Sequence, residues 1–156
     1  MAAAEACECG AAAPCLEVWH EVLEAEQEDA AMYPWHLPLV CAFVLQHRSH
    51  FLAPHADVQF RIIQFYVDKG VDATGWFARH QVARNGKAKR GFDMTPLQPY
   101  VALPRSAFPG RFALSVHDLA DGSGGYVGDG YPAYGERMRS LARATIEGWL
   151  TTPPRE

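Results

Sequence analysis

Lysine and arginine are absent from the first 47 residues of the chain, which nevertheless hold eight of its 18 Asp and Glu residues. A secretory signal peptide starts with basic residues ahead of an apolar segment, so this N-terminus is not expected to direct export. All 14 Lys and Arg residues therefore lie in residues 48–156, together with the other ten acidic residues. The imbalance indicates either electrostatic complementarity within the fold or an acidic face that binds a basic protein partner.

Long apolar runs are also missing. No stretch of about 18 consecutive apolar residues occurs, and the longest apolar stretch, Leu37–Leu45, is interrupted by Pro38. This excludes a transmembrane helix, and we expect a soluble, cytoplasmic protein with no membrane partner. The chain has only four cysteines, and in the cytoplasm these are expected to be thiols rather than a disulfide framework. A chain of 156 residues buries enough surface to fold without a disulfide or a metal ion.

Apolar residues at helical spacing predict a mainly α fold of four or five helices. The first, residues 15–29, has an apolar stripe that includes Trp19 and an acidic opposite face. The second, residues 38–50, is apolar on nearly all sides, so we expect it at the buried centre of the domain. Prolines that start helices and glycines that end them delimit the other helices. These are predicted at residues 54–69, 72–83 and 133–150.

Residues 84–133 contain little that predicts regular structure. Five of the 11 prolines and most of the glycines lie there, and an irregular segment of that length is usually functional or mobile. One alternating run, Phe112–His117, predicts a strand, so the segment holds at most a short β-hairpin. The expected organisation is a flexible, cysteine-bearing leader (residues 1–13) followed by a single helical domain (residues 14–156).

Three cysteines near the N-terminus form the most chemically distinctive cluster in the chain, namely Cys7, Cys9 and Cys15. Thiolates bind soft metals, and the neighbouring Gly10 allows the loop to wrap tightly around an ion. If the first two helices form an antiparallel hairpin about residue 33, Cys15 lies level with residue 51. His47 and His50, three residues apart on one helical face, then approach the cysteines.

This convergence predicts a structural zinc site. Its expected ligands are Cys7, Cys9, Cys15 and His47, with His50 as the substitute ligand. The Cys-x-Cys spacing differs from the usual Cys-x2-Cys pair, so the alternative is that the leader thiols are exposed and bind nothing. Cys41, in the middle of the apolar helix, is interpreted as a small buried hydrophobe.

Two other clusters have weaker functional interpretations. Basic residues beside aromatic ones can hold single-stranded nucleic acid, and here they are Arg79, Arg84, Lys87, Lys89 and Arg90. The net charge of −4 makes a nucleic-acid partner unfavourable. The glycine-rich run 121–126 lacks the Gly-Lys-Ser/Thr ending of a phosphate-binding loop. No catalytic residue is assigned, because the few serines lie outside any nucleophile motif.

Three classes of function remain open at this point. The first is a zinc-binding protein in which the metal is structural and the function is interaction with another protein. The second is an interaction or inhibitory protein, of the immunity type, that binds no metal. The third is a metal-dependent enzyme, which needs convergent ligands and an open coordination position. The sequence favours the first class.

The order of these features resembles an uncharacterised bacterial domain-of-unknown-function family of short helical proteins. That family has an N-terminal Cys pair, a Tyr-x-x-Gln-His-Pro motif and a C-terminal helix containing Trp. The matching positions in this sequence are Cys7, Cys9, Gln46, His47 and Trp149. The resemblance implies that the cysteines and the Gln-His pair are the characteristic polar residues, and it implies no activity.

The chain also departs from the family pattern. Its cysteines have the shorter Cys-x-Cys spacing, and Arg48 stands where the family has proline. Gln59 and Arg61 stand in the third helix where a histidine would be expected.

Overall fold

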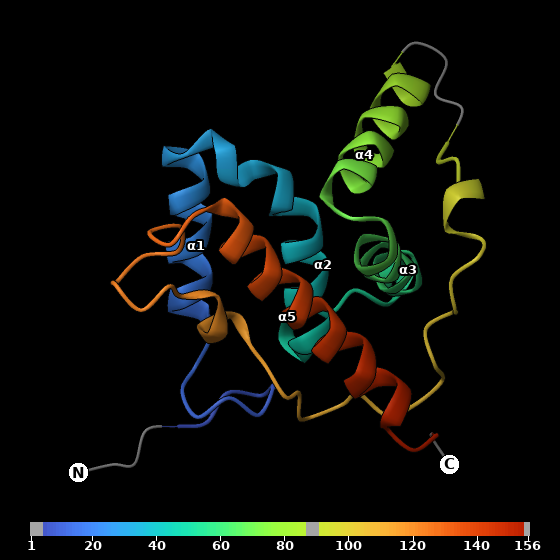
Figure 1. The fold of residues 1–156 in the computed structure, drawn as a ribbon. Coiled ribbons are helices and arrows are strands. Elements are labelled where there is room, and N and C mark those ends of the chain that lie inside the picture. The colour runs from blue at the N-terminus through green and yellow to red at the C-terminus, as the bar shows by residue number, and fades with distance from the viewer. Residues whose placement is uncertain (1–4, 87–90, 155–156) are drawn as a thin grey trace.

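The computed structural model describes residues 5–86 and 91–154, which contain five α-helices and four short 3₁₀ helices (Figure 1). The α-helices are α1 (Leu16–Glu28), α2 (His36–Gln46), α3 (Ala53–Lys69), α4 (Val71–Gly86) and α5 (Tyr131–Thr151). The 3₁₀ helices are η1 (Ala30–Trp35), η2 (Arg48–His50), η3 (Thr95–Leu97) and η4 (Val116–Leu119). The mainly α fold that the sequence predicts is confirmed.

Helix α2 lies at the centre of the domain, as its uniformly apolar sequence predicts. Leu39, Phe43 and Leu45 are at most 1% exposed. Helices α3 and α5 both pack on α2 and on each other, and α5 crosses in front of α2 in Figure 1. A helix that is apolar on every side is stable only when other helices surround it, which is the position α2 occupies.

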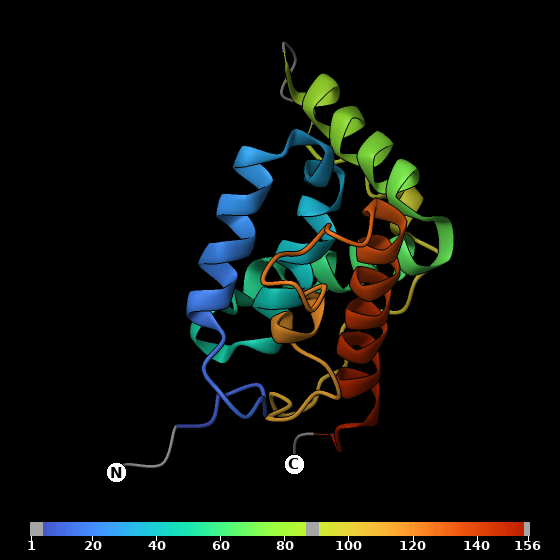
Figure 2. The same ribbon diagram turned by 60° about the vertical axis from the view of Figure 1, so that its left-hand side comes forward.

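Helices α1 and α2 form the antiparallel hairpin on which the predicted site depends (Figure 2). The chain turns between them through η1, where the Asp29 carboxylate accepts a hydrogen bond from the amide of Ala31 (3.1 Å). Trp19 of α1 stacks on Phe43 of α2, with 4.1 Å between the ring centroids. The pairing brings Cys15, at the start of α1, next to the residues that follow α2.

Helix α2 ends at Gln46, earlier than predicted. The backbone of His47 is extended (φ −124°, ψ 106°), and the chain continues into η2. Side chains bond the last carbonyls of the helix: His47 Nδ1 lies 2.7 Å from the Phe43 oxygen, and Trp149 Nε1 donates to the Leu45 oxygen at 2.9 Å. The prediction that His47 and His50 share a helical face is wrong, because the helix ends before both.

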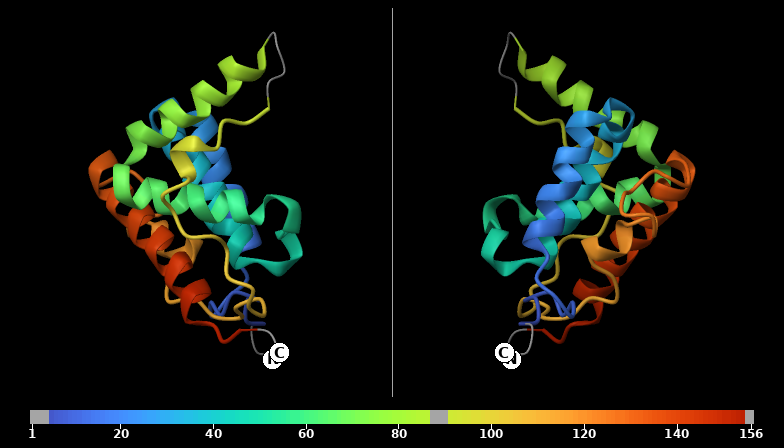
Figure 3. Two further views of the ribbon diagram at one scale, coloured as in Figure 1. Left: turned by 90° about the vertical axis from the view of Figure 1, so that its right-hand side faces the viewer. Right: turned by 90° about the vertical axis from the view of Figure 1, so that its left-hand side faces the viewer.

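Gly70 separates α3 from α4, as the sequence predicts. Its φ of +91° is a left-handed value that favours glycine, and its amide donates to the Tyr66 carbonyl at 2.8 Å. Helix α4 is longer than predicted and projects from the body of the molecule (Figure 3). Its buried Phe77 packs on Phe65 of α3, with ring centroids 6.1 Å apart.

The strand predicted at Phe112–His117 is wrong. Residues 84–86 end α4 and residues 131–133 begin α5, and the described residues between them, 91–130, contain the 3₁₀ helices η3 and η4 and no strand. Ser115 instead caps η4: its hydroxyl accepts from the amide of His117 (3.2 Å), and the Asp118 carboxylate accepts from the amide of Ser115 (2.8 Å). The alternating pattern arises because Phe112, in an irregular segment, and Val116, the first residue of η4, are both buried in the core without a partner strand.

Segments far apart in the sequence meet at one end of the molecule (Figures 1 and 3): the N-terminal loop, residues 103–112 and the end of α5. The amide of Phe112 donates to the Cys9 carbonyl at 3.0 Å, and Ser106 pairs with Pro154 in an isolated antiparallel bridge. The described part of the leader packs on the helices here, and the flexibility expected of residues 1–13 stays a prediction. Among the described residues, no helix combines the length and the apolarity that a membrane crossing requires.

Candidate metal centre

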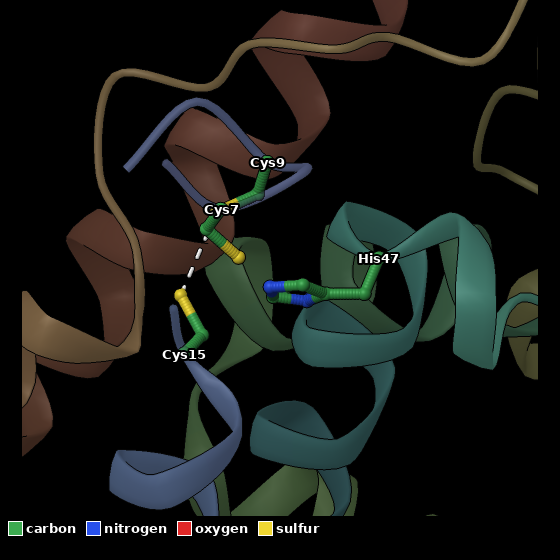
Figure 4. A group of neighbouring side chains, drawn as sticks. All are labelled: Cys7, Cys9, Cys15 and His47. Atoms are coloured by element: carbon green, nitrogen blue, oxygen red, sulfur yellow. Dashed lines mark hydrogen bonds between the residues drawn. The ribbon is translucent and has the colours of Figure 1, made fainter. Parts of the chain in front are cut away.

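Four side chains converge where the N-terminal loop meets the end of α2 (Figure 4). The sulfurs of Cys7, Cys9 and Cys15 and a ring nitrogen of His47 all lie within 4.8 Å of one another, and the Cys9 and Cys15 sulfurs are 3.6 Å apart. In tetrahedral zinc coordination with bonds of about 2.3 Å, neighbouring thiolate sulfurs are about 3.8 Å apart. The cluster therefore has nearly the dimensions of a metal tetrahedron.

A tight turn in the leader presents Cys7 and Cys9. The amide of Gly10 donates to the Cys7 carbonyl, and the amide of Cys7 donates to the Ala11 carbonyl, both at 2.9 Å. Gly10 has a φ of +92°, and a Cβ atom there would lie 3.0 Å from Cγ and 3.1 Å from Cα of Arg111. The turn therefore requires glycine, both for its backbone conformation and for the close approach of the 110–112 segment.

Two further contacts fix the leader. The Glu8 carboxylate accepts hydrogen bonds from the amide (3.0 Å) and the hydroxyl (2.6 Å) of Ser49 in η2. Burial opposes ionisation of Glu8, but these hydrogen bonds outweigh it and lower the pKa of this carboxyl. Near the end of the leader, His117 Nε2 lies 3.1 Å from the carbonyl oxygens of Ala13 and Pro14. The cysteines therefore stand on a loop anchored at both ends.

The ring of His47 is held in a defined orientation. Because Nδ1 lies 2.7 Å from the Phe43 carbonyl oxygen, it carries the hydrogen and donates it. The ring also stacks on Phe43 (centroids 4.1 Å), which itself stacks on Trp19. In the neutral imidazole this leaves a lone pair on Nε2, the tautomer that backbone carbonyls fix in metal-binding histidines.

The Nε2 atom of His47 is buried and has no hydrogen-bond partner among residues 5–86 and 91–154. The residue is only 3% exposed, and Cys9 and Cys15 are each 1% exposed. A buried polar atom without a partner is costly, so in a native protein it indicates an atom or ion that completes its bonding. Here the atom lies beside three thiol sulfurs, a type of ligand that zinc commonly takes.

The electrostatics of the cluster favour a bound cation. The hydrogen bond from Cys15, together with the proximity of His47, lowers the pKa of the Cys9 thiol against the effect of burial. The same interaction with Cys9 raises the pKa of Cys15. Burial disfavours the imidazolium, but Cys9 and the Phe43 carbonyl raise the pKa of His47 to about 9. An ionised Cys9 therefore favours the protonated form of His47. A divalent cation in the same place would allow all three thiols to ionise.

The structure brings together four of the five residues predicted for the site and leaves out His50. The exposed His50 ring has its Nδ1 3.0 Å from the Ser49 hydroxyl, and its centroid is 6.4 Å from that of His47. Cys41 is buried in α2 outside the cluster, and burial raises its thiol pKa to about 12. Cys41 is therefore a buried, protonated thiol, as the sequence indicates.

Several residues that support the site have no metal-site signal in the sequence. Gln46, 1% exposed, donates through Nε2 to the Leu114 carbonyl and to the Thr145 hydroxyl, both at 2.9 Å. Together with the bond from Trp149 to Leu45, this holds the 112–115 segment and α5 against the end of α2. The resemblance singles out Gln46 and Trp149 by position, but only the fold reveals that they support the segment carrying His47.

The other clusters have plain structural roles. In the 121–128 loop the Asp121 carboxylate accepts from the amides of Ser123 (2.8 Å) and Gly128 (2.6 Å), so these amides bind a side chain of the loop itself. Of the basic run, Arg84 donates to the Gly91 carbonyl at 3.0 Å. Arg79 is exposed on α4, and the remaining members, Lys87, Lys89 and Arg90, lie outside the described residues.

The chain belongs to a family of unknown function, DUF5946, whose model matches residues 4–150. The match includes the leader cysteines, the Gln46-His47 pair and Trp149, and it agrees with the resemblance to an uncharacterised domain family. Comparisons with curated proteins and with solved structures find no match.

Proposed function

We propose that the protein binds one zinc ion in a structural centre that fastens its N-terminal loop to the end of α2. The proposed ligands are Cys7, Cys9, Cys15 and His47 Nε2. The observation that carries the proposal is the buried, unpartnered Nε2 of His47, which is held by the Phe43 carbonyl in the metal-binding tautomer and lies with three sulfurs.

The donor set favours zinc in a structural role. Three thiolates and one imidazole form a soft, tetrahedral set of the kind that structural zinc sites use. Four protein ligands fill the tetrahedron and leave no open position for substrate or water, which a catalytic zinc site requires. A metal-dependent enzyme is therefore the less favoured alternative.

The function that the centre supports is an interaction with another protein. Glu17, Glu21, Glu24 and Glu28 are all exposed on α1, directly after the last cysteine ligand. None of these four forms an ion pair with a described residue. A rigid acidic helix suits a partner with a basic surface, because complementary charge steers association. The alternative is an inhibitory protein of the immunity type that binds no metal.

Metal analysis of protein purified without a metal-binding tag tests the zinc centre. We expect about one equivalent of zinc per chain, because the four ligands form a single tetrahedral site. Cys9→Ser should lose the metal, whereas Cys41→Ala, which removes a buried thiol outside the cluster, should retain it. Zinc below about a tenth of an equivalent, together with four thiols that react freely in the folded protein, would contradict the proposal.

The partner is tested separately by changing charge alone. The quadruple variant with Glu→Gln at positions 17, 21, 24 and 28 keeps the helix but removes its acidic face. A partner recovered from the source cell extract should bind the wild-type protein in a salt-dependent manner and bind this variant weakly. Equal recovery by both proteins would exclude the acidic face as the binding surface.

A further inference from the structure

A pocket lies beside the residues that follow His47. It has a volume of about 930 Å³ and forms where η2 and the start of α3 meet residues 103–108 and the end of α5. Its functional lining consists of Arg48, Phe51, Arg105, Ser106, Phe108 and Trp149. Pockets that bind small molecules have volumes of roughly 300–1,000 Å³ and combine aromatic walls with a few polar groups. None of the proposed zinc ligands lines this pocket.

Phe51 and Phe108, which are partly exposed, form the apolar wall of the pocket, and the buried Trp149 supports them. Phe51 stacks on Trp149, with 5.7 Å between centroids and 23° between planes. Phe108 meets both rings edge-on, with centroids 5.4 Å from Phe51 and 5.3 Å from Trp149. The bond from Trp149 Nε1 to the Leu45 carbonyl fixes the indole, so the wall is preorganised for a flat apolar group.

Two cations from separate segments line the same pocket. Arg48 belongs to η2 and Arg105 to the loop after Leu103, and both are exposed. Within the described part of the chain, neither guanidinium forms an ion pair or a hydrogen bond. Two guanidinium groups that converge on one cavity bind carboxylate, sulfonate or phosphate oxygens through charge-assisted hydrogen bonds.

The segment that carries Arg105 is held in place by its neighbour. Ser106 also lines the pocket, and it pairs with Pro154 in the isolated antiparallel bridge, which ties this segment to the end of the chain.

We propose that this pocket binds a small aromatic organic anion. The aromatic body lies against Phe51 and Phe108, which Trp149 supports from behind, and the acid group pairs with Arg48 and Arg105. A neutral aromatic compound would contact only the aromatic wall, and an inorganic anion would pair only with the two arginines. A molecule that carries both an aromatic ring and an acid group uses both parts of the pocket, and this defines the ligand class. The site is independent of the zinc centre.

Two fluorescent probes of similar shape test the proposal. Anilinonaphthalene sulfonate carries an acid group, whereas N-phenylnaphthylamine is its uncharged counterpart. We expect saturable binding of one anionic probe per folded chain, with weaker binding of the neutral probe. The double variant Arg48→Gln/Arg105→Gln should weaken binding of the anionic probe by about tenfold or more, because it removes two charge-assisted contacts, and should leave the neutral probe unchanged.

The matched control is Lys69→Gln/Arg79→Gln, which removes two exposed positive charges elsewhere and should leave both probes bound. Phe108→Ala should weaken both probes, because it removes part of the aromatic wall. Cys9→Ser should retain probe binding even though it loses zinc, which separates this proposal from the zinc proposal. Absence of saturable binding, equal losses in the two charge variants, or equal loss of both probes in Arg48→Gln/Arg105→Gln would overturn the proposal.

Discussion

At the scale of single residues, the candidate centre depends on which nitrogen of one imidazole carries a proton. The Phe43 carbonyl accepts from Nδ1 of His47 and leaves Nε2 for the cysteine cluster. His50 is only three residues away, but it is exposed and faces the Ser49 hydroxyl. The sequence alone therefore does not distinguish His47 from His50 as a ligand, because both are histidines close to the predicted end of the helix. The difference arises because α2 ends at Gln46, which turns only His47 toward the cysteines.

We predict that His47→Gln lowers zinc affinity by about 100-fold or more, because removal of a ligand exceeds the effect of losing a residue that merely orients one. His50→Gln is the matched control and should retain full zinc occupancy. Competition with a coloured chelator measures both affinities on the same scale. If the two variants lost zinc equally, His50 would also be a ligand and the assigned set would be wrong.

A second prediction at this scale concerns Asp121. Hydrogen bonds from Ser123 lower the pKa of this carboxyl from its usual 3.8 to about 2, against the effect of desolvation. Because the folded pKa is the lower one, the ionised carboxylate stabilises the fold above about pH 4, and this contribution disappears as the pH falls to about 2. Asp121→Asn should therefore unfold at a lower temperature than the wild type at pH 7.

The temperature difference between Asp121→Asn and the wild type should be constant from pH 7 to about pH 4 and shrink below it. Thermal unfolding followed by circular dichroism across this range measures the difference. A difference that grew on acidification would contradict the assigned direction of the pKa.

At the scale of elements, helices could be predicted from the sequence better than the segments between them. Helical stripes, prolines at helix starts and Gly70 sufficed for α1 to α5, because each signal is local. The run Phe112–His117 predicts a strand but forms none, because residues of an irregular segment and of η4 that are buried in turn produce the same alternation as a strand face. The cysteine cluster was predictable because an α1–α2 hairpin places Cys15 beside the residues that follow α2. The early end of α2 was not, because the Leu45 carbonyl is bonded by Trp149, more than 100 residues away in the sequence.

The leader turn provides the prediction at this scale. Gly10→Ala places a Cβ atom in a left-handed backbone conformation and within 3.0 Å of Arg111, which costs roughly 1–3 kcal/mol. Because this turn holds the bound state, zinc affinity should drop by about fivefold to 150-fold. Gly110→Ala is the control on the facing segment, because a Cβ there meets nothing within 4 Å. Equal zinc affinity in the two variants would show that the turn does not position the cysteines.

At the scale of the whole molecule, most of the hydrophobic core lies outside the proposed zinc ligands. Buried residues of α2, α3 and α5 form the greater part of it, among them Leu39, Phe60, Ile63 and Leu141, although the buried Cys9 and Cys15 pack against this core. A chain of this size buries enough apolar surface in such a core to fold unaided. The proposed centre would therefore fix the leader on a domain that is already formed, in contrast to small zinc domains whose folding depends on the metal.

Removal of zinc by chelation should accordingly loosen one end of the molecule and leave the helices intact. The far-ultraviolet circular dichroism spectrum should be almost unchanged, because none of the five helices is held only by the centre. Amide hydrogen exchange should increase in residues 5–14 and at Ser49, which lose the anchor that fixes their contacts, while α2, α3 and α5 stay protected. The thermal midpoint should fall, because a ligand that binds only the folded state stabilises it.

Two variants serve as controls for the chelation experiment. Cys41→Ala should respond to the chelator as the wild type does. Cys9→Ser, without any chelator, should already behave like the chelated wild-type protein. Cooperative loss of helicity on chelation would instead place the metal within the folding core, and unchanged exchange in the leader would show that its hydrogen bonds to Ser49 and Phe112 hold it without an ion.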